Sequence, residues 1–469
     1  RTLALRALAP HFEHKLFLSA TPHNGYPESF AALLELLDDQ RFSRGMRTPD
    51  RVQLARTMVR RLKSELPPTD LGEPRFPKRS LLPLEIDYPD SELRAHAALQ
   101  QYAGLRQHRA GDDAERYASE FVLKLLKKRL FSSPEAFHLT LQVHLQSLQG
   151  PRDTNPRTRP TRGLLEREIS GAQEESADDD AHEQQNLEVV ATASRALVTT
   201  NIDEQDILAE LLTWAKRAAS GPDAKAQALL DFLGRTVRPE GQWGRTRVLI
   251  FTEYRATQNW LFELLSLHGY TAGGRTDVLY GGMDPRKREA VKAAFQADPD
   301  AAPVRVLLAT DAASEGIDLQ NHCSILVHYE IPWNPSRMEQ RNGRVDRHGQ
   351  RAKQVQIFHF VGRGFSETNR ETPPGDLAGD LEFLMRIALR VDKSREDLAS
   401  AGDLLATQVE ETMLGKRRSI SVVASDPRAA RARETLKLER ELRKQLERLR
   451  ESLEHSRRHL HLSPERVLA

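Results

Sequence analysis

The sequence predicts an α/β protein built on a parallel β-sheet that helices cover on both faces. Between Lys225 and Gly362, short apolar runs alternate with amphipathic helical stretches, and the runs are apolar at nearly every position. Strands buried on both faces of a parallel sheet have this composition, whereas half-buried antiparallel strands alternate apolar with polar residues. The chain has 469 residues, which is more than a single hydrophobic core usually serves. We therefore expect further segments outside the sheet.

The expected strands and helices follow in chain order. A short buried strand is predicted at 15–20 and a helix at 28–37. Residues 80–86 are predicted as an edge strand because they include Pro83. The parallel sheet is predicted to contain strands 248–251, 278–280, 304–309, 325–329 and 355–360, with helices at 259–267 and 286–295 between them.

Helical patterning is also predicted outside the sheet, at 91–146 and near 204–215. Residues 150–186 are rich in Pro, Arg and Thr and end in an acidic run, Glu174 to Asp180, which predicts a flexible insertion. In the tail, leucines recur at helical spacing within charged sequence, which predicts a charged amphipathic helix. Docking on its own domain is the simplest interpretation, and the sequence leaves dimerisation and inhibition open.

The composition narrows the class of protein. The 69 Lys and Arg residues nearly cancel the 67 Asp and Glu residues, so the net charge does not by itself indicate nucleic-acid binding. A single cysteine, Cys323, excludes internal disulfides and suits a reducing cytoplasm. No run of about 18 apolar residues exists, so we expect no membrane span. The chain starts with Arg1 rather than Met, and we expect it to be part of a longer protein.

An arginine-rich segment, 340–347, carries the sharpest chemical signal. Arg344 and Arg347 are three residues apart, so on a helix they would share one face and reach one target together. Phosphoryl transfer needs positive charge where negative charge develops, and an arginine finger contributes about 10³–10⁵ in rate. The alternative is an arginine-rich helix that only faces solvent.

Small and hydroxyl-bearing residues follow the strand predicted at 304–309. Thr310 and Ser314 lie at the carboxyl end of that strand, where parallel sheets bind ligands. Hydroxyls and backbone N–H groups there can hold a nucleic-acid phosphate. Asp318 could position the arginines or contact the ribose of a nucleotide. Ordinary turn chemistry is the alternative.

Two further hydroxyls, those of Ser19 and Thr21, follow the strand predicted at 15–20. A turn of this kind can link a metal-binding carboxylate to motion of the loop beyond it. Without that role, the segment is a simple turn.

Four segments occur in an order that resembles motifs III to VI of superfamily-two helicases and translocases. They are 18–22, 251–254, 309–319 and 340–347. Further segments resemble the Swi/Snf branch of that superfamily, namely 60–63, 76–78, 81–86, 223–230 and 279–288. Within that branch, 128–134 and 395–403 resemble the bacterial RapA-like group, and 21–44 is similar to the Swi/Snf-like helicase of DISARM defence systems. The resemblance covers most of the chain outside 147–190 and the tail beyond about 425.

The resemblance implies two RecA-like lobes, with ATP and magnesium bound between them and double-stranded DNA crossing both. Such proteins usually walk on duplex DNA without fully separating it, and contacts with the DNA backbone rather than with bases suffice for this. By the matching positions, Arg344 and Arg347 would be the arginine fingers. Gln340, Gly316 and Asp318 would contact the nucleotide, Ser19 and Thr21 would couple hydrolysis to DNA, and Thr252, Thr310 and Ser314 would bind DNA, with Gly316 also beside the strand track.

The resemblance also divides the chain. It implies the C-terminal end of a first RecA-like lobe at 1–90, a helical insertion at 91–220, a complete second lobe at 221–365, a helical brace at 366–427 and the tail helix at 428–469. The sequence has no Gly-x-x-x-x-Gly-Lys-Ser/Thr loop and no Asp-Glu-x-His segment, so the residues that cradle phosphates and bind magnesium are expected upstream of Arg1. On its own the chain is expected not to hydrolyse ATP, and no metal site of its own is predicted.

Three functions are open on this basis. The leading hypothesis is the C-terminal portion of a cytoplasmic, DNA-stimulated translocase ATPase whose partners are a defence complex or RNA polymerase. A second is a non-catalytic lobe that binds DNA or a partner protein, although a retired site has no chemical reason to keep both arginines. A third is an RNA or single-strand helicase, for which few aromatic residues are present near the motifs as stacking platforms.

Overall fold

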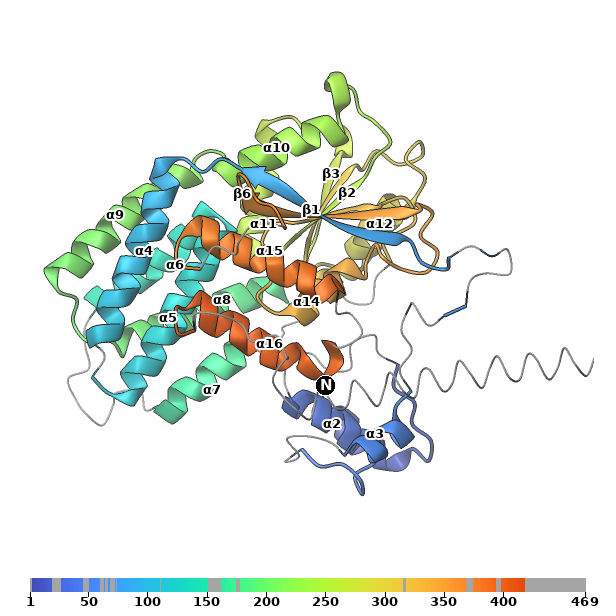
Figure 1. The fold of residues 1–469 in the computed structure, drawn as a ribbon, viewed down its shortest axis with the longest axis horizontal. Coiled ribbons are helices and arrows are strands. Elements are labelled where there is room, and N and C mark those ends of the chain that lie inside the picture. The colour runs from blue at the N-terminus through green and yellow to red at the C-terminus, as the bar shows by residue number, and fades with distance from the viewer. Residues whose placement is uncertain are drawn as a thin grey trace, which may run out of the picture. The chain divides into compact units, whose positions relative to one another are not determined.

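The computed structural model shows a helical cluster beside a parallel sheet (Figure 1). It describes residues 2–18, 27–44, 50–59, 63, 66–67, 72, 74–109, 111–150, 162–173, 178–314, 318–367, 374–393 and 398–417. The chain forms two units, 1–418 and 419–469, and all described residues belong to the first. The predicted tail helix therefore lies outside the described residues.

The sheet contains six described strands, all parallel, in the order β1-β6-β5-β2-β4-β3. This confirms the predicted fold class and each of the five strands predicted between 248 and 360. The strands are β1 (Lys78–Ile86), β2 (Val248–Thr252), β3 (Thr276–Leu279), β4 (Val306–Thr310), β5 (Ile325–His328) and β6 (Gln354–Gly362).

Both faces of the sheet are buried because alternate side chains of each strand enter different cores. Val248 and Ile250 of β2 pack with α10 (Ala224–Thr236) and α11 (Arg255–Leu267). Their neighbours Leu249 and Phe251 pack with α12 (Pro285–Gln296) on the other face. A continuous apolar run is thus required at β2, as the sequence indicated.

Strand β1 lies at the end of the sheet and pairs only with β6 among the described strands. The pairing is in register over nine positions, from Lys78 opposite Gln354 to Ile86 opposite Gly362. Pro83 is tolerated because an end strand has one unpaired side, which confirms the predicted edge strand.

The strand predicted at 15–20 is wrong for residues 15–18. They adopt no regular structure, and Leu16 and Leu18 are 82% and 88% exposed. An isolated apolar run gains nothing as a strand unless another strand supplies hydrogen bonds, and no described strand lies beside it. Residues 19–20 lie outside the described residues. The helix that follows is confirmed as α2 (Pro27–Leu37).

A separate core joins six helices between residues 90 and 219. They are α4 (Asp90–Arg109), α5 (Asp113–Ser132), α6 (Pro134–Gln149), α7 (Arg162–Gln173), α8 (Asp179–Arg195) and α9 (Ile202–Ala219). The helices predicted at 91–146 and 204–215 are confirmed. The flexible insertion predicted at 150–186 is wrong for α7 and the start of α8, because Leu165, Ile169 and Ala172 recur at helical spacing and are buried in this core.

The remaining described elements are short or lie late in the chain. They are α1 (Thr2–Leu8), α3 (Arg51–Thr57), α13 (Asp311–Ser314), α14 (Pro335–Asn342), α15 (Leu377–Lys393), α16 (Leu398–Met413) and 3-10 turns at Ala9–His11, Pro239–Gly241 and Ala272–Gly274. Helix α15 packs against β6 and α16 against α14, and both lie within 366–427, where a helical brace is predicted.

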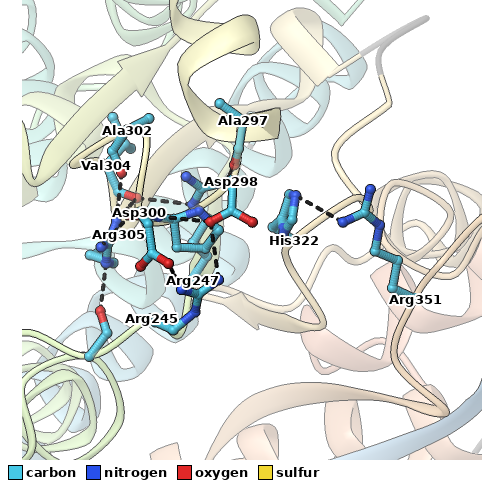
Figure 2. A network of polar contacts seen from close by, with 12 residues as sticks. Arg245, Arg247, Ala297, Asp298, Asp300, Ala302, Val304, Arg305, His322 and Arg351 are labelled. Carbon is cyan, nitrogen blue, oxygen red and sulfur yellow. Dashed lines mark hydrogen bonds and ion pairs between the residues drawn. The ribbon is translucent and has the colours of Figure 1, made fainter.

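At the amino ends of β2 and β4, buried arginines bind main-chain oxygens (Figure 2). Arg247 donates to the carbonyls of Ala294, Phe295, Ala297 and Val304 at 3.3, 2.5, 2.5 and 3.0 Å. Arg305 donates to those of Gly244, Pro299, Ala302 and Val304 at 2.6, 2.8, 2.8 and 3.1 Å. Buried carbonyls need such partners, so the two arginines fasten the loop before β4 to the sheet. Arg245, 60% exposed, instead pairs with Asp298 and Asp300.

Candidate functional site

Two residues singled out by the sequence, Thr252 and Thr310, lie at the opposite edge of the sheet, where β2, β4 and β5 end. Strand β2 ends at Thr252, β4 at Thr310 and β5 at His328. Because the strands are parallel and adjacent, the segments that leave them lie side by side. We call this region the carboxyl edge.

A buried ion pair lies at the centre of the carboxyl edge. Arg341 of α14 donates to both carboxylate oxygens of Asp311, which follows β4, at 2.5 and 2.8 Å. It also donates to the carbonyl of Glu330 at 3.2 Å. Burial acts to lower the pKa of Arg341, but Asp311 outweighs it and the pKa is raised. The pair fixes α14 against the end of β4 and keeps Arg341 charged.

Arg344 and Arg347 follow α14 in turns. The helix ends at Asn342, so the prediction that both arginines share one helix face is wrong. Between the two arginines, Asp346 is buried and pairs with Arg79 of β1 at 2.5 Å and with Lys63 at 3.1 Å. These tertiary ion pairs hold Asp346 in the segment of turns that follows the helix. If the helix continued through this segment, Asp346 would point in another direction.

The ion pairs of Asp346 hold the segment that carries the two arginines. Arg79 is buried and also contacts Glu339 at 2.6 Å and Asp392 at 3.3 Å. Burial alone would raise the pKa of Asp346, yet Arg79 and Lys63 lower it. Asp346 thus stays ionised and holds the segment that carries Arg344 and Arg347.

Asp318 forms an ion pair with Arg347. Their side chains are 52% and 44% exposed, so the guanidinium stays accessible from solvent. This geometry agrees with the option that Asp318 positions an arginine. Gln340 lies on α14 and is partly buried. Ser19, Thr21 and Gly316 lie outside the described residues, and so does the side chain of Ser314.

Thr252 is buried at the end of β2, where its hydroxyl donates to Glu330 at 3.0 Å. The backbone N–H of Glu253 donates to the same carboxylate. The side chain of Glu253 contacts Lys128 of α5 at 3.0 Å and Arg337 of α14 at 3.5 Å. Burial acts to raise the pKa of Glu253, but these cations lower it to about 2. The end of β2 is therefore tied to the helical core by charge.

Thr310 is also buried, beneath the first turn of α8. Its hydroxyl donates to Asp179 at 2.6 Å, and the backbone N–H of Gly281 donates to the same oxygen at 2.5 Å. Next to it, Arg255 donates to Asp180 at 3.1 Å. Burial raises the pKa of Asp179. Two side chains predicted to bind DNA, Thr252 and Thr310, thus bind carboxylates of this chain.

Within the described part of the chain, no group of three or more His, Cys, Asp or Glu side chains is arranged to hold a metal ion. Arginines and hydroxyls instead suit phosphate groups. The same part of the chain contains no helix with the length and apolar character of a bilayer span.

Comparison with known families identifies the sheet region. Residues 224–349 match the family profile described as the helicase conserved C-terminal domain. This region is therefore similar to helicase C-terminal domains. Its parallel sheet therefore has the RecA-like architecture predicted for the second lobe, and the resemblance to helicases is confirmed at this level.

Similar proteins agree with the helicase C-terminal domain. An uncharacterized ATP-dependent helicase of Bacillus subtilis (strain 168), YqhH, is 40% identical over 115 residues, 24% of this chain and 19% of the relative. The ATP-dependent RNA helicase eIF4A of Neurospora crassa is 30% identical over 136 residues, 27% of this chain and 32% of the relative. The chain thus spans less than a third of the length of these relatives.

A solved structure, the C-terminal part of the Fun30 ATPase domain, is similar at 14% identity with a TM-score of 0.38, covering 72% of this chain and 98% of that one. The likeness is slight.

Sequence reasoning missed three residues of the site: Arg341, Glu330 and Asp179. Arg341 and Asp311 were within the segments that were recognised, and a carboxylate directly after a strand is a natural partner for a buried arginine. For Asp179, the only available signal was the acidic run that ends at Asp180, and its position opposite Thr310 depends on tertiary structure.

Proposed function

We propose that this chain supplies the second lobe of an ATP-driven translocase that moves along double-stranded DNA. The observation that supports this most directly is the arrangement of Arg347, whose accessible guanidinium is held by Asp318 on a turn that the buried pairs of Asp346 support. A cation at a fixed position on an exposed turn is what a phosphoryl-transfer site between two lobes requires.

In this proposal the arginines of the chain act on ATP, and a separate lobe holds it. Arg347, with Arg344 beside it in sequence, would face the phosphate that is transferred and stabilise the charge that develops there. Arg341 is a positioning residue, because it is buried against Asp311. Magnesium would neutralise phosphate charge when bound, and its ligands would belong to the lobe that carries the phosphate loop.

The nucleic acid would lie along the carboxyl edge. Backbone N–H groups, hydroxyls and arginines are the groups that contact phosphates without reading bases, and Gly281, Thr310 and Arg255 present one of each. Movement along DNA of any sequence needs only such contacts. Duplex DNA, rather than RNA, is proposed on the resemblance of the segments around β1 and β3 to the Swi/Snf branch.

The test is steady-state ATP hydrolysis by the enzyme that includes the phosphate-loop lobe, with increasing duplex DNA, single-stranded DNA or RNA. We expect strong stimulation by duplex DNA, and a fall of about 10³-fold or more in turnover for Arg347→Ala with DNA affinity little changed. Arg245→Ala is the matched control, because Arg245 is also an exposed arginine paired with aspartates but is not proposed to face ATP.

Three results would count against the proposal. Near-normal turnover in Arg347→Ala would contradict the assignment of Arg347 as an arginine finger. Stimulation by RNA but not by DNA would show that the nucleic acid on which the enzyme acts is RNA. A folded protein that binds DNA but hydrolyses no ATP would favour the non-catalytic module.

For the cellular role, we extend the proposal to antiphage defence on the resemblance of residues 21–44 to the DISARM helicase. Deleting the gene should raise the plating efficiency of phages on the host. Unchanged plating together with slower release of RNA polymerase from its template would favour transcription recycling instead.

A further inference from the structure

Three phosphate-type donors meet at adjacent strand ends of the carboxyl edge. Gly281 follows β3, Thr310 ends β4, and Arg255 begins the helix after β2. Since the sheet order here is β2-β4-β3, these groups lie side by side. Together they offer a backbone N–H, a hydroxyl and a guanidinium to one anion, which is the set that a phosphodiester takes from a protein.

The chain's own aspartates occupy these donors. One oxygen of Asp179 accepts from both the Gly281 N–H and the Thr310 hydroxyl, at 2.5 and 2.6 Å. Asp180 accepts from Arg255 at 3.1 Å. The peptide N–H of Asp179 in turn donates to the Gly281 carbonyl at 3.1 Å. Two successive carboxylates thus bind where we propose that the DNA backbone binds.

Gly282 shows how closely the acidic turn approaches. Its φ is +85°, a conformation that favours glycine, and a Cβ built there would lie 2.7–2.8 Å from the carboxyl group of Asp178. Any side chain at this position would push Asp178 away. The loop after β3 is therefore shaped to receive the first turn of α8.

The rest of α8 is anchored separately. Glu183 pairs with the buried Arg129 of α5 at 2.6 Å, and Val190 and Ala193 are fully buried in the helical core. The first turn can therefore fray without loss of that core, because helix ends open at low free-energy cost. Burial raises the pKa of Asp179, so the ionised carboxylate is already disfavoured in this contact. This also favours opening of the first turn.

From these contacts we infer that residues 178–180 are an internal substitute for a DNA phosphate group, which closes the donor set of Gly281, Thr310 and Arg255 until duplex DNA displaces it. This autoinhibitory contact rests on the proposed function, because it needs the carboxyl edge to be the DNA track. It predicts that neutralising the acidic turn strengthens DNA binding, although the variant removes contacts seen in the structure.

The experiment measures the affinity of the full chain for a fluorescein-labelled duplex by anisotropy at fixed salt. Asp179→Asn keeps the shape of the side chain and should bind about tenfold more tightly, the effect of about one charge-assisted contact. Asp180→Asn, at an exposed side chain, is a second variant for which misfolding is not a concern. Asp203→Asn is the matched control, because it removes the same charge from the exposed first turn of α9.

Two further measurements identify the mechanism. In the Thr310→Val background, Asp179→Asn should give a smaller gain, because one of the two donors that Asp179 occupies is gone. Hydrogen exchange should show that duplex DNA speeds exchange at the amides of 180–182 and slows it at Gly281.

The outcomes separate this inference from the function on which it rests. If the wild-type chain binds duplex DNA and neither Asp179→Asn nor Asp180→Asn differs from Asp203→Asn, the autoinhibitory contact is overturned while the DNA track stands. If no form of the chain binds nucleic acid at any salt concentration, the proposed function fails, and the inference with it.

Discussion

The buried arginines at the amino ends of β2 and β4 have different partners from the arginines at the carboxyl edge. At the amino edge, Arg247 and Arg305 donate to uncharged carbonyls of the nearby main chain. At the carboxyl edge, Arg341 and Arg255 meet carboxylates, and Thr310 meets a carboxylate from a helix 131 residues earlier. Main-chain carbonyls neither titrate nor leave, whereas a carboxylate can be replaced by another anion. The contacts of Arg247 and Arg305 are therefore expected to persist, whereas another anion can replace Asp179 at Thr310.

The largest expected effect comes from breaking the amino edge. Arg247→Ala leaves several buried carbonyls without a donor, and we expect the free energy of unfolding to fall by about 3–5 kcal/mol. Urea denaturation measures this. Arg245→Ala, two residues away but exposed, should cost less than about 1 kcal/mol. Equal losses in the two variants would show that the buried carbonyl contacts have no special role.

A smaller effect is expected from pH at the carboxyl edge. The pKa of Glu253 is lowered to about 2 in the folded chain, so the folded state binds fewer protons than the unfolded state below its ordinary value of 4.5. The stabilisation is therefore present above about pH 4.5 and is lost as pH falls towards 2, and it is on the order of 3 kcal/mol.

Glu253→Gln should lower stability at pH 7 and flatten its dependence on pH between 5 and 3, measured by denaturation at each pH. Asp298→Asn, which removes a carboxylate from an exposed ion pair with Arg245, serves as the control. An unchanged profile in Glu253→Gln would mean that Lys128 and Arg337 do not hold this carboxylate as described.

The smallest effect on stability is expected at the exposed pair of Asp318 and Arg347. Asp318→Asn should change the free energy of unfolding by less than about 0.5 kcal/mol. If Asp318 positions Arg347, ATP turnover by the complete enzyme should nevertheless fall about threefold to tenfold. A stability loss as large as that of Arg247→Ala would place this pair among the structural contacts instead.

The strands were predictable because a strand buried on both faces is apolar at every position, which is visible in the local sequence. Val248 to Phe251 is apolar throughout, and the pattern requires no knowledge of the neighbouring strands. Helix α7 was missed because a biased composition around it masked the spacing of Leu165, Ile169 and Ala172.

The site was predictable only in part, because its decisive contacts join residues far apart in the chain. Thr310, Arg347 and Asp318 were chosen from sequence, and the structure pairs the last two. The pairing of Asp346 with Arg79, 267 residues earlier, was not predictable from the sequence. The same holds for Asp179, whose partner Thr310 becomes visible only in the fold.

The nine-position pairing of β1 with β6 has a mechanical consequence. Tension that arrives through the residues before Lys78 pulls along the axis of β1, parallel to its neighbour. A force in that direction loads the ladder in shear, so its hydrogen bonds share the force and do not open one after another. An end strand with a proline in it can thus transmit a pulling force into the sheet without peeling away.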